Sequence, residues 1–253
     1  MPTPARTRQV HVEHVMGTAV SIDLRTGAGA AGMIEETVRW LHHVDATFST
    51  YKPDSVISRI GRGDIAPADC DADVRFVYHQ CECLRGQTHG YFDAWASGSF
   101  DPSAYVKGWS LQRAADRMTY VGIEDFCLTA GGDVVTRGSS VDGVPWRVGI
   151  QHPLDRAATA ARIEASDLAV ATSGAYERGD HVLDPVTGRV PRGVLSVTVA
   201  GPDLGTADAL ATAAYAMGAD GPSWTLGLGC YEAMTILSDE TVLCTPGFDE
   251  LLA

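Results

Sequence analysis

The chain has 253 residues, of which 45% are hydrophobic and 20% charged, as is ordinary for a soluble globular protein. This length suits one large domain or two intimately joined ones, and we expect a single domain over residues 1–253. With 19 Lys and Arg against 32 Asp and Glu, the formal net charge is −13. Such a surface repels phosphate backbones, so we expect no nucleic-acid binding, although a metal ion could still mask charge around a phosphate ligand.

No apolar run approaches the roughly 20 residues that cross a bilayer, and residues 1–14 lack the apolar core of a signal peptide. We therefore expect a cytoplasmic protein without membrane insertion. None of the six cysteines forms a C-x-x-C pair. Free, mostly buried thiols are thus expected in place of a zinc site.

Apolar periodicity predicts the main elements in chain order. Alternation between Val10 and Leu24 predicts a hairpin that turns at 16–18. Apolar residues at helical spacing predict five helices, over about 30–48, 55–62, 74–86, 106–118 and 206–217. Further strands are expected at 126–129, 146–150, 167–172 and 195–200, with a closing hairpin over 235–244. Because strands and helices alternate without β-α-β regularity, the sequence predicts an α+β (mixed α/β) fold and no barrel or doubly wound sheet.

Asp208 and Thr212 stand four residues apart on the helix predicted over 206–217, so they share one face. A carboxylate and a hydroxyl placed in this way offer two hard oxygen ligands to Mg²⁺. In the alternative interpretation, Asp208 only complements the helix dipole near the first turn, with Thr206 as the N-cap.

Asp101 and Ser103 are natural caps for a helix that begins near Ala104. A lysine in the first turn of a helix opposes the dipole, so Lys107 could have an anionic partner such as a phosphate. On local evidence alone, a solvated surface lysine is the better interpretation.

The segment 172–188 is polar and rich in turns, and it lies between two predicted strands. Its His181 is flanked by Asp180 and Asp184, which could tune a general base near neutral pH. The alternative is a structural histidine in a turn.

Several aromatic residues, and one Gly-Gly-Asp motif, fall beside turns and outside the periodic faces. Rings at such positions either stack on a flat ligand or close the ends of the core; they are Tyr51, Tyr91, Phe92 and Trp95. The motif at 131–133 either lets the backbone approach a ligand or forms a plain tight turn.

Taken in order along the chain, these motifs resemble the ApbE family of FAD:protein FMN transferases. The resemblance rests on eight segments that cover nearly the whole chain. They are M-G-T (16–18), F-S-T-Y-K-P-D-S-V-I-S (48–58), G-Y-F-D (90–93), D-P-S-A-Y-V-K-G-W (101–109), A-G-G-D-V (130–134), W-R-V-G-I-Q-H-P (146–153), residues 172–188 and S-V-T-V-A-G-P-D-L-G-T-A-D-A-L-A-T-A (196–213).

The resemblance implies an ApbE-like fold of two intimately packed subdomains. It also implies a reaction in which FMN moves from FAD to a threonine or serine hydroxyl of a target protein, and AMP is released. The implied metal is usually Mg²⁺, with Mn²⁺ and Ca²⁺ as alternatives. The implied FAD contacts are Met16, Tyr51, Tyr91, Phe92, Asp93, Asp101, Lys107 and Leu183. The implied metal ligands are the side chains of Asp208 and Thr212 and the carbonyls of Ala104 and Ala211, and the implied base is His181.

Three departures from the family pattern keep other activities open. The segment between Asp93 and Asp101 is short, Ser103-Ala104 replaces a common Gly-Gly, and Ala211 stands where some members have a second Asp. Hydrolysis of FAD to FMN and AMP, or a non-catalytic FAD-binding module, would use the same residues. The sequence does not identify the acceptor protein.

Overall fold

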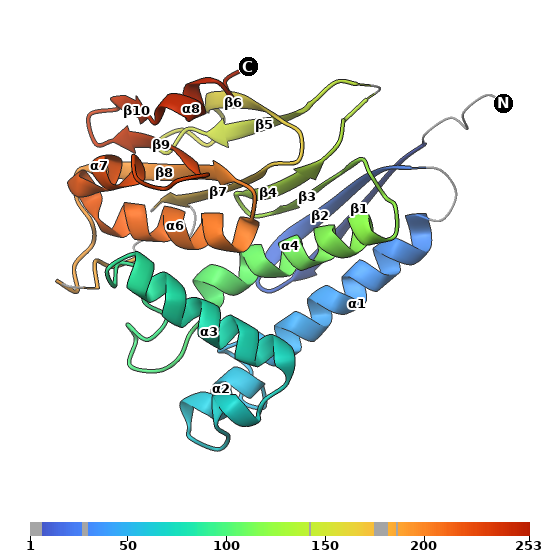
Figure 1. Cartoon of the computed structure of the whole chain (residues 1–253), viewed down its shortest axis with the longest axis vertical. Helices are drawn as coiled ribbons and strands as arrows, with labels where there is room; N and C mark the ends of the chain where they lie inside the picture. Colours follow the sequence, from blue (N-terminus) through green and yellow to red (C-terminus); the bar gives the residue numbers. More distant parts are fainter. Residues whose placement is uncertain (1–6, 27–29, 142, 175–181, 186) are drawn as a thin grey trace.

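The computed structural model describes residues 7–26, 30–141, 143–174, 182–185 and 187–253. Its centre is an eight-stranded sheet in which neighbouring strands pair antiparallel (Figure 1). In spatial order the strands are β1 (Thr7–Val15), β2 (Thr18–Thr26), β3 (Phe126–Ala130), β4 (Asp133–Arg137), β7 (Ala169–Gly174), β8 (Val194–Gly201), β9 (Glu232–Leu237) and β10 (Val242–Cys244).

Helices cover one face of this sheet, and a small second sheet covers the other. The helices next to the large sheet are α1 (Ala30–Phe48), α4 (Ser103–Tyr120) and α6 (Leu204–Ala216) (Figure 1). Farther out lie α2 (Val56–Gly61) and α3 (Ala72–Gln87), and short helices occur at α7 (Gly221–Thr225) and α8 (Pro246–Asp249). Single 3₁₀ turns are η1 (Pro67–Asp69) and η2 (Gly218–Asp220). The second sheet pairs β5 (Trp146–Gln151) with β6 (Thr159–Ala165).

Two hydrophobic clusters lie on the two sides of the large sheet. In β8, Val197 and Val199 belong to the cluster beneath the helices, whereas Ala200 belongs to the cluster beneath β5 and β6. Side chains of a strand alternate between its two faces, so one strand contributes to both clusters. This antiparallel sheet with helices on one face confirms the α+β prediction.

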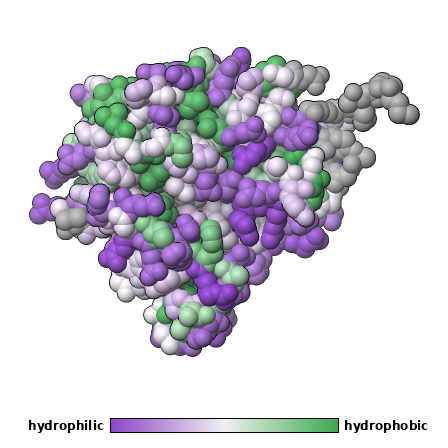
Figure 2. All heavy atoms as spheres, in the orientation of Figure 1, coloured by the Kyte–Doolittle hydropathy of each residue, from purple (hydrophilic) through white to green (hydrophobic). Residues whose placement is uncertain are grey.

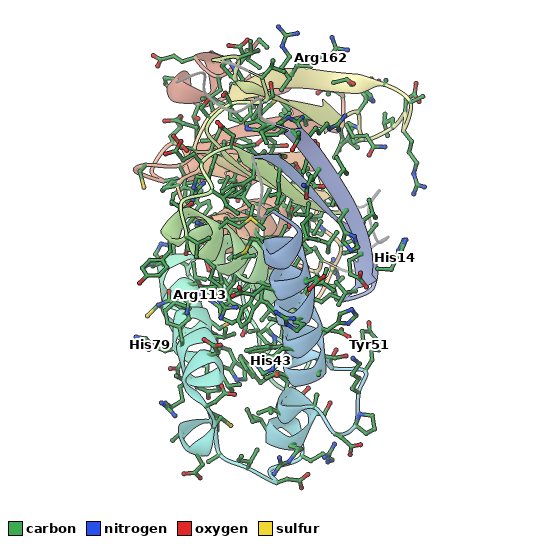
Figure 3. The ribbon with its side chains drawn as sticks, turned by 90° about the vertical axis from the view of Figure 1, so that its right-hand side faces the viewer. His14, His43, Tyr51, His79, Arg113 and Arg162 are labelled. Atoms are coloured by element: carbon green, nitrogen blue, oxygen red, sulfur yellow. The ribbon has the colours of Figure 1, made fainter. Side chains whose placement is uncertain are left out.

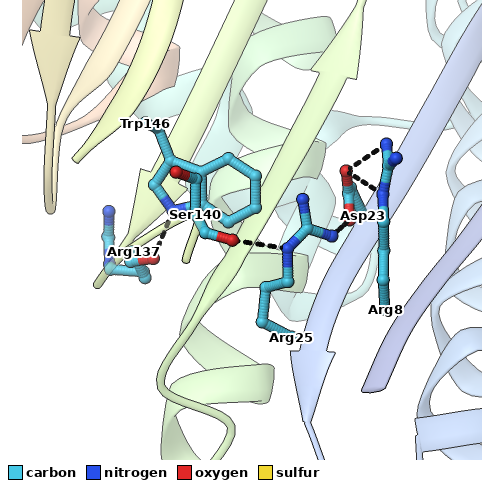
Figure 4. A network of polar contacts seen from close by, with 6 residues as sticks. All are labelled: Arg8, Asp23, Arg25, Arg137, Ser140 and Trp146. Atoms are coloured by element: carbon cyan, nitrogen blue, oxygen red, sulfur yellow. Dashed lines mark hydrogen bonds and ion pairs between the residues drawn. The ribbon is translucent and has the colours of Figure 1, made fainter. Parts of the chain in front are cut away.

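Arg25 of β2 contacts the segment that leads from the large sheet into β5 of the second sheet (Figure 4). Its Nε donates to the carbonyl of Ser140 at 2.6 Å, and its guanidinium lies 4.9 Å from the ring centroid of Trp146. The same guanidinium pairs with Asp23, which also accepts from Arg8 at 3.0 Å. Cation–π and charge-assisted contacts of this kind hold the start of β5 against β2.

Most of the predicted elements are confirmed to within a few residues, and the differences have local causes. The Ser55 hydroxyl accepts from the Ser58 N–H at 3.0 Å and caps α2 as predicted. The predicted Thr206 cap is wrong, because α6 begins earlier and Asp203 accepts from the Thr206 N–H at 2.8 Å. The strands β4 and β6 were not predicted. Strand β4 has only five residues, and β6 contains the charged residues Arg162 and Glu164.

Hydrophilic residues are spread over the face seen in Figure 2, with hydrophobic residues in several separate areas between them. Across the part of the chain with described positions, no helix combines the length and hydropathy that a bilayer-crossing segment needs. All six cysteines are free, as predicted, but only Cys70 and Cys81 are buried, and Cys230 is exposed. Burial raises the pKa of Cys127 to about 12 and that of Cys244 to about 11, so these thiols are poor nucleophiles at neutral pH.

The helices α4 and α6 cross in close contact at two glycines. A Cβ built on Gly108 would lie 2.5 Å from the carbonyl oxygen of Leu204, and one on Gly205 would lie 2.9 Å from the Tyr105 ring. At the same crossing, the Gln112 side-chain oxygen accepts from the Leu204 N–H at 3.0 Å. Because both glycines lack a side chain, the backbones of α4 and α6 can approach each other closely. Gln112 satisfies a buried donor at the start of α6.

Gly108→Ala should force the two helices apart and lower the free energy of unfolding by about 1–3 kcal/mol, the usual cost of overpacking. Urea denaturation followed by circular dichroism measures the change. Gly86→Ala is the matched control, since Gly86 is an exposed residue of α3 with open space at its Cβ. That variant should be neutral or gain up to about 1 kcal/mol. Equal stabilities of the two variants would contradict a steric role for Gly108.

Candidate active site

A cavity of about 570 Å³ opens where the start of α4 faces α6, a size typical of small-molecule sites. The segments around it come from distant parts of the chain: the loops after α1 and α3, the end of β7, and residues 182–185 and 188. Seven of the predicted FAD contacts line it: Tyr51, Tyr91, Phe92, Asp93, Asp101, Lys107 and Leu183. So do three of the predicted metal ligands: Ala104, Asp208 and Thr212.

Residues 91–101 form one wall of the cavity, and hydrogen bonds and an ion pair stabilise this short segment. The backbone N–H of Asp101 donates to the carbonyl of Ala94 at 2.7 Å and closes the loop. The Asp93 carboxylate accepts from the Trp95 N–H at 2.9 Å and pairs with Arg85 at 3.3 Å. The shortened segment between Asp93 and Asp101 therefore forms a closed turn that presents both carboxylates at the cavity.

The aromatic residues at the cavity have different environments. Phe92 is 2% exposed and belongs to the core, whereas Tyr51 is 96% exposed and projects from the loop after α1 (Figure 3). Trp95 packs edge-on against Tyr78, with ring centroids 5.3 Å apart, and does not line the cavity. Of the two interpretations of these rings, core closure therefore applies to Phe92 and Trp95, and Tyr51 has a surface available for stacking.

A buried charge cluster lies at the floor of the cavity, between α4, β4 and α6. The Lys107 ammonium pairs with the Asp133 carboxylate and lies 3.2 Å from Oδ2 of Asp208. The side chains of Asp133 and Asp208 are 1% and 6% exposed, and that of Lys107 is 17% exposed. The interpretation of Lys107 as a solvated surface lysine is therefore wrong, because its anionic partners are two buried carboxylates.

The donors beside this cluster suit a hard divalent cation. Asp208 and Thr212 lie one turn apart on the same face of α6, and the Thr212 hydroxyl is 3.3 Å from that of Ser173. Ala104, in the first turn of α4, lines the same cavity. Carboxylate, hydroxyl and carbonyl oxygens are the ligands that Mg²⁺, Mn²⁺ and Ca²⁺ prefer. In the described ranges, no three His, Cys, Asp or Glu side chains converge as a zinc-type site would require.

Two of the predicted residues do not line the cavity, and one lies outside the described residues. Met16 sits in the β1–β2 turn with φ 55°, and its sulfur accepts from the Ser110 hydroxyl at 3.8 Å. The Ala211 side chain is fully buried in the core. Roles for Met16 and for the Ala211 carbonyl stay predictions. His181 falls in the segment 175–181, outside the described residues.

Two polar residues at this site, Asp133 and Ser173, were assigned no role from the sequence. The Gly-Gly-Asp motif that ends at Asp133 predicts either a close backbone approach to a ligand or a tight turn, and Ser173 lies in the polar segment 172–188. The available signal was the position of Asp133 directly after a strand and a glycine pair, where a carboxylate can be buried at a sheet end. Its partner Lys107 belongs to a different segment, so the pairing itself had no local signal.

A model of the ApbE family matches residues 16–99 and 96–230 of the chain. The chain belongs to the ApbE family. The match includes the loop 91–101, the Lys107–Asp133–Asp208 cluster and Thr212, so the residues around the cavity lie within the family's domain.

Curated relatives and solved structures agree with this membership. The chain is 35% identical over 167 residues to a FAD:protein FMN transferase of Vibrio cholerae. This alignment covers 62% of the chain and 50% of the relative. It is 31% identical over 224 residues to one of Rhodobacter capsulatus, covering 85% of the chain and 39% of the relative. The chain thus spans half or less of the length of these two relatives.

The fold closely matches a solved ApbE-family structure. The flavin transferase ApbE from Vibrio cholerae superposes with a TM-score of 0.85 at 25% identity, covering 98% of this chain and 100% of that one. The predicted fold of the family is therefore confirmed over nearly the full length of the chain.

Lys107→Met should lower the free energy of unfolding by about 3–5 kcal/mol, because it leaves buried carboxylates without their ammonium. Lys52→Met is the control, since Lys52 pairs with Asp45 on the surface and half of its side chain is exposed. Loss of an exposed pair costs about 0–1 kcal/mol. Urea denaturation measures both variants, and a Lys107 variant as stable as the control would contradict a buried charge cluster.

Proposed function

We propose that this chain transfers FMN from FAD to a threonine or serine hydroxyl of an acceptor protein, releases AMP and uses a divalent metal, with Mg²⁺ as the first candidate. The observation that carries the proposal is the cavity itself. Residues predicted to contact FAD or metal come from five separate segments of the sequence and line a single cavity. The names of the curated relatives support the same chemistry.

The proposed reaction is a phosphoryl-type transfer in which one bond forms and one breaks. The acceptor hydroxyl oxygen bonds to the phosphorus of the FMN half, and the bond from that phosphorus to the oxygen shared with AMP breaks. AMP leaves with that oxygen, and the hydroxyl proton passes to a base. Such transfers depend mainly on positioning and on neutralising phosphate charge.

The chain's own residues supply both requirements in this proposal. Lys107 lies at the cavity floor, where its ammonium can donate to a pyrophosphate oxygen. Asp208, Thr212 and the Ala104 carbonyl would hold the metal, with the Ala211 carbonyl as a further candidate. When bound, the metal would act as a Lewis acid and stabilise charge on the phosphates. Leu183, 46% exposed, offers an apolar wall to the flavin ring.

The activity test incubates the full chain with FAD, MgCl₂ and candidate acceptor proteins. Covalent flavin is read as fluorescence of the acceptor in a denaturing gel, and AMP by chromatography. Asp208→Asn should lower turnover by about 100-fold or more, because several kcal/mol of charge stabilisation depend on the metal. Asp203→Asn is the matched control on the same helix, since Asn remains a good N-cap and Asp203 does not line the cavity.

The outcomes of this test separate the alternatives. FMN and AMP formed without an acceptor would indicate hydrolysis. Retention of FAD with neither AMP nor covalent flavin, on every acceptor tried, would contradict the proposed transfer. Full activity of Asp208→Asn would show that the metal assignment is wrong even if transfer occurs.

His181 is proposed as the base that takes the proton of the acceptor hydroxyl. His181→Ala should therefore bind FAD with unchanged affinity and lose transfer by roughly 10²–10⁴-fold, the usual contribution of general-base catalysis. His79→Ala is the control, because His79 is an exposed residue of α3 away from the cavity. FAD binding is followed by flavin fluorescence. A His181 variant that transfers FMN at the full rate would refute the assignment.

A further inference from the structure

Asp133 is the buried carboxylate behind the cavity floor, and no step of the proposed reaction uses it. It opens β4 directly after the tight turn that contains Gly131, which has φ 59°. Its side chain is 1% exposed and does not line the cavity, whereas both Lys107 and Asp208 do. Burying a carboxylate costs several kcal/mol unless it is paired, so its pairing with Lys107 is what makes this position tolerable.

The Lys107 ammonium lies between two carboxylates that have different surroundings. Asp133 meets it from the sheet side and also accepts from the backbone N–H of Thr172 at 3.4 Å. Asp208 meets it from α6, 3.2 Å away, and faces the cavity. An ammonium and a divalent cation next to one carboxylate compete for the same oxygens and repel each other.

We propose that Asp133 is a positioning residue: its carboxylate draws the Lys107 ammonium toward the sheet side and so weakens the pairing of that ammonium with Asp208, whose carboxylate can then also bind a divalent cation. The inference rests on the proposed function, in which Asp208 is a metal ligand. With the charge of Asp133 removed, the ammonium would turn to Asp208 and occupy the oxygens that the metal needs. Asp133 would thus affect the metal through Lys107 and not by direct contact.

The test is a Mn²⁺ titration of the full chain, with and without FAD and without acceptor, followed by the electron paramagnetic resonance signal of free Mn²⁺. Asp133→Asn should weaken Mn²⁺ binding by roughly 10–100-fold, as is typical when a residue that supports a metal ligand is lost. In a Lys107→Met background the same substitution should change the affinity by no more than about twofold, because no ammonium remains to compete. Urea denaturation of each variant confirms that it is folded at the titration temperature.

Two further variants separate positioning from general loss of structure. Asp125→Asn removes a buried carboxylate, 5% exposed, that accepts from the Ser139 N–H at 2.7 Å at the opposite end of the β3–β4 hairpin. It should lower stability and leave the Mn²⁺ affinity within about twofold of wild type. Asp133→Glu keeps the charge beside Lys107 and should retain most of the affinity even if it is less stable.

Three results for the Asp133 variants would overturn the inference. One is an Asp133→Asn protein that is folded and binds Mn²⁺ as wild type does. The second is an equal loss of affinity in both Lys107 backgrounds, and the third is an equal loss in Asp133→Glu and Asp133→Asn. A fourth result bears on the metal site as a whole. If the wild-type chain binds no Mn²⁺ under either condition, the metal site and the inference fail together, which distinguishes that case from a failure of Asp133 alone.

Discussion

The backbone contact between Gly108 of α4 and the start of α6 at Leu204 and Gly205 sets the position of the whole candidate site. Lys107 directly precedes the α4 glycine, and Asp208 lies about one turn after Gly205 on α6. A side chain at either glycine would press the helices apart, because its Cβ would lie within 2.9 Å of atoms of the facing helix or its first residue. The van der Waals contact at these glycines therefore determines the distance between Lys107 and Asp208. Tightly packed helices move as rigid units, so a shift at the contact also shifts the charged groups.

The charge cluster that this contact creates is costly for the folded protein without a ligand. Lys107, Asp133 and Asp208 are all mostly buried, and desolvation opposes each charge. One ammonium shared between two carboxylates neutralises at most half of their combined charge. The negative charge that remains favours the binding of a further cation. The same ammonium can meet the negative phosphates of a ligand in the cavity. In the proposed function, the further cation would be the divalent metal and the phosphates would be those of FAD.

Local patterns predicted much of the scaffold because short-range physics controls those parts. Helical spacing and a serine cap located α1 and α2, and alternation located the hairpin of β1 and β2, since each depends on residues a few positions apart. The ordered motifs also predicted ten of the residues that line the cavity. The same reasoning failed at the Thr206 cap, where Asp203 begins the helix earlier, and at β4, whose short run follows a glycine pair.

By itself, then, the sequence determined the class of fold, the order of its main elements, the family and the residue types available for phosphate and metal chemistry. Only the tertiary structure decided which of those residues meet. It paired Lys107 with Asp133 and Asp208, brought Ser173 to Thr212, and left Met16 and the Ala211 side chain away from the cavity lining. The physical reason is that each of these contacts joins residues far apart in the chain, on elements whose relative position depends on how the helices cross and how the strands pair. Periodicity and capping describe single elements and carry no information about such contacts.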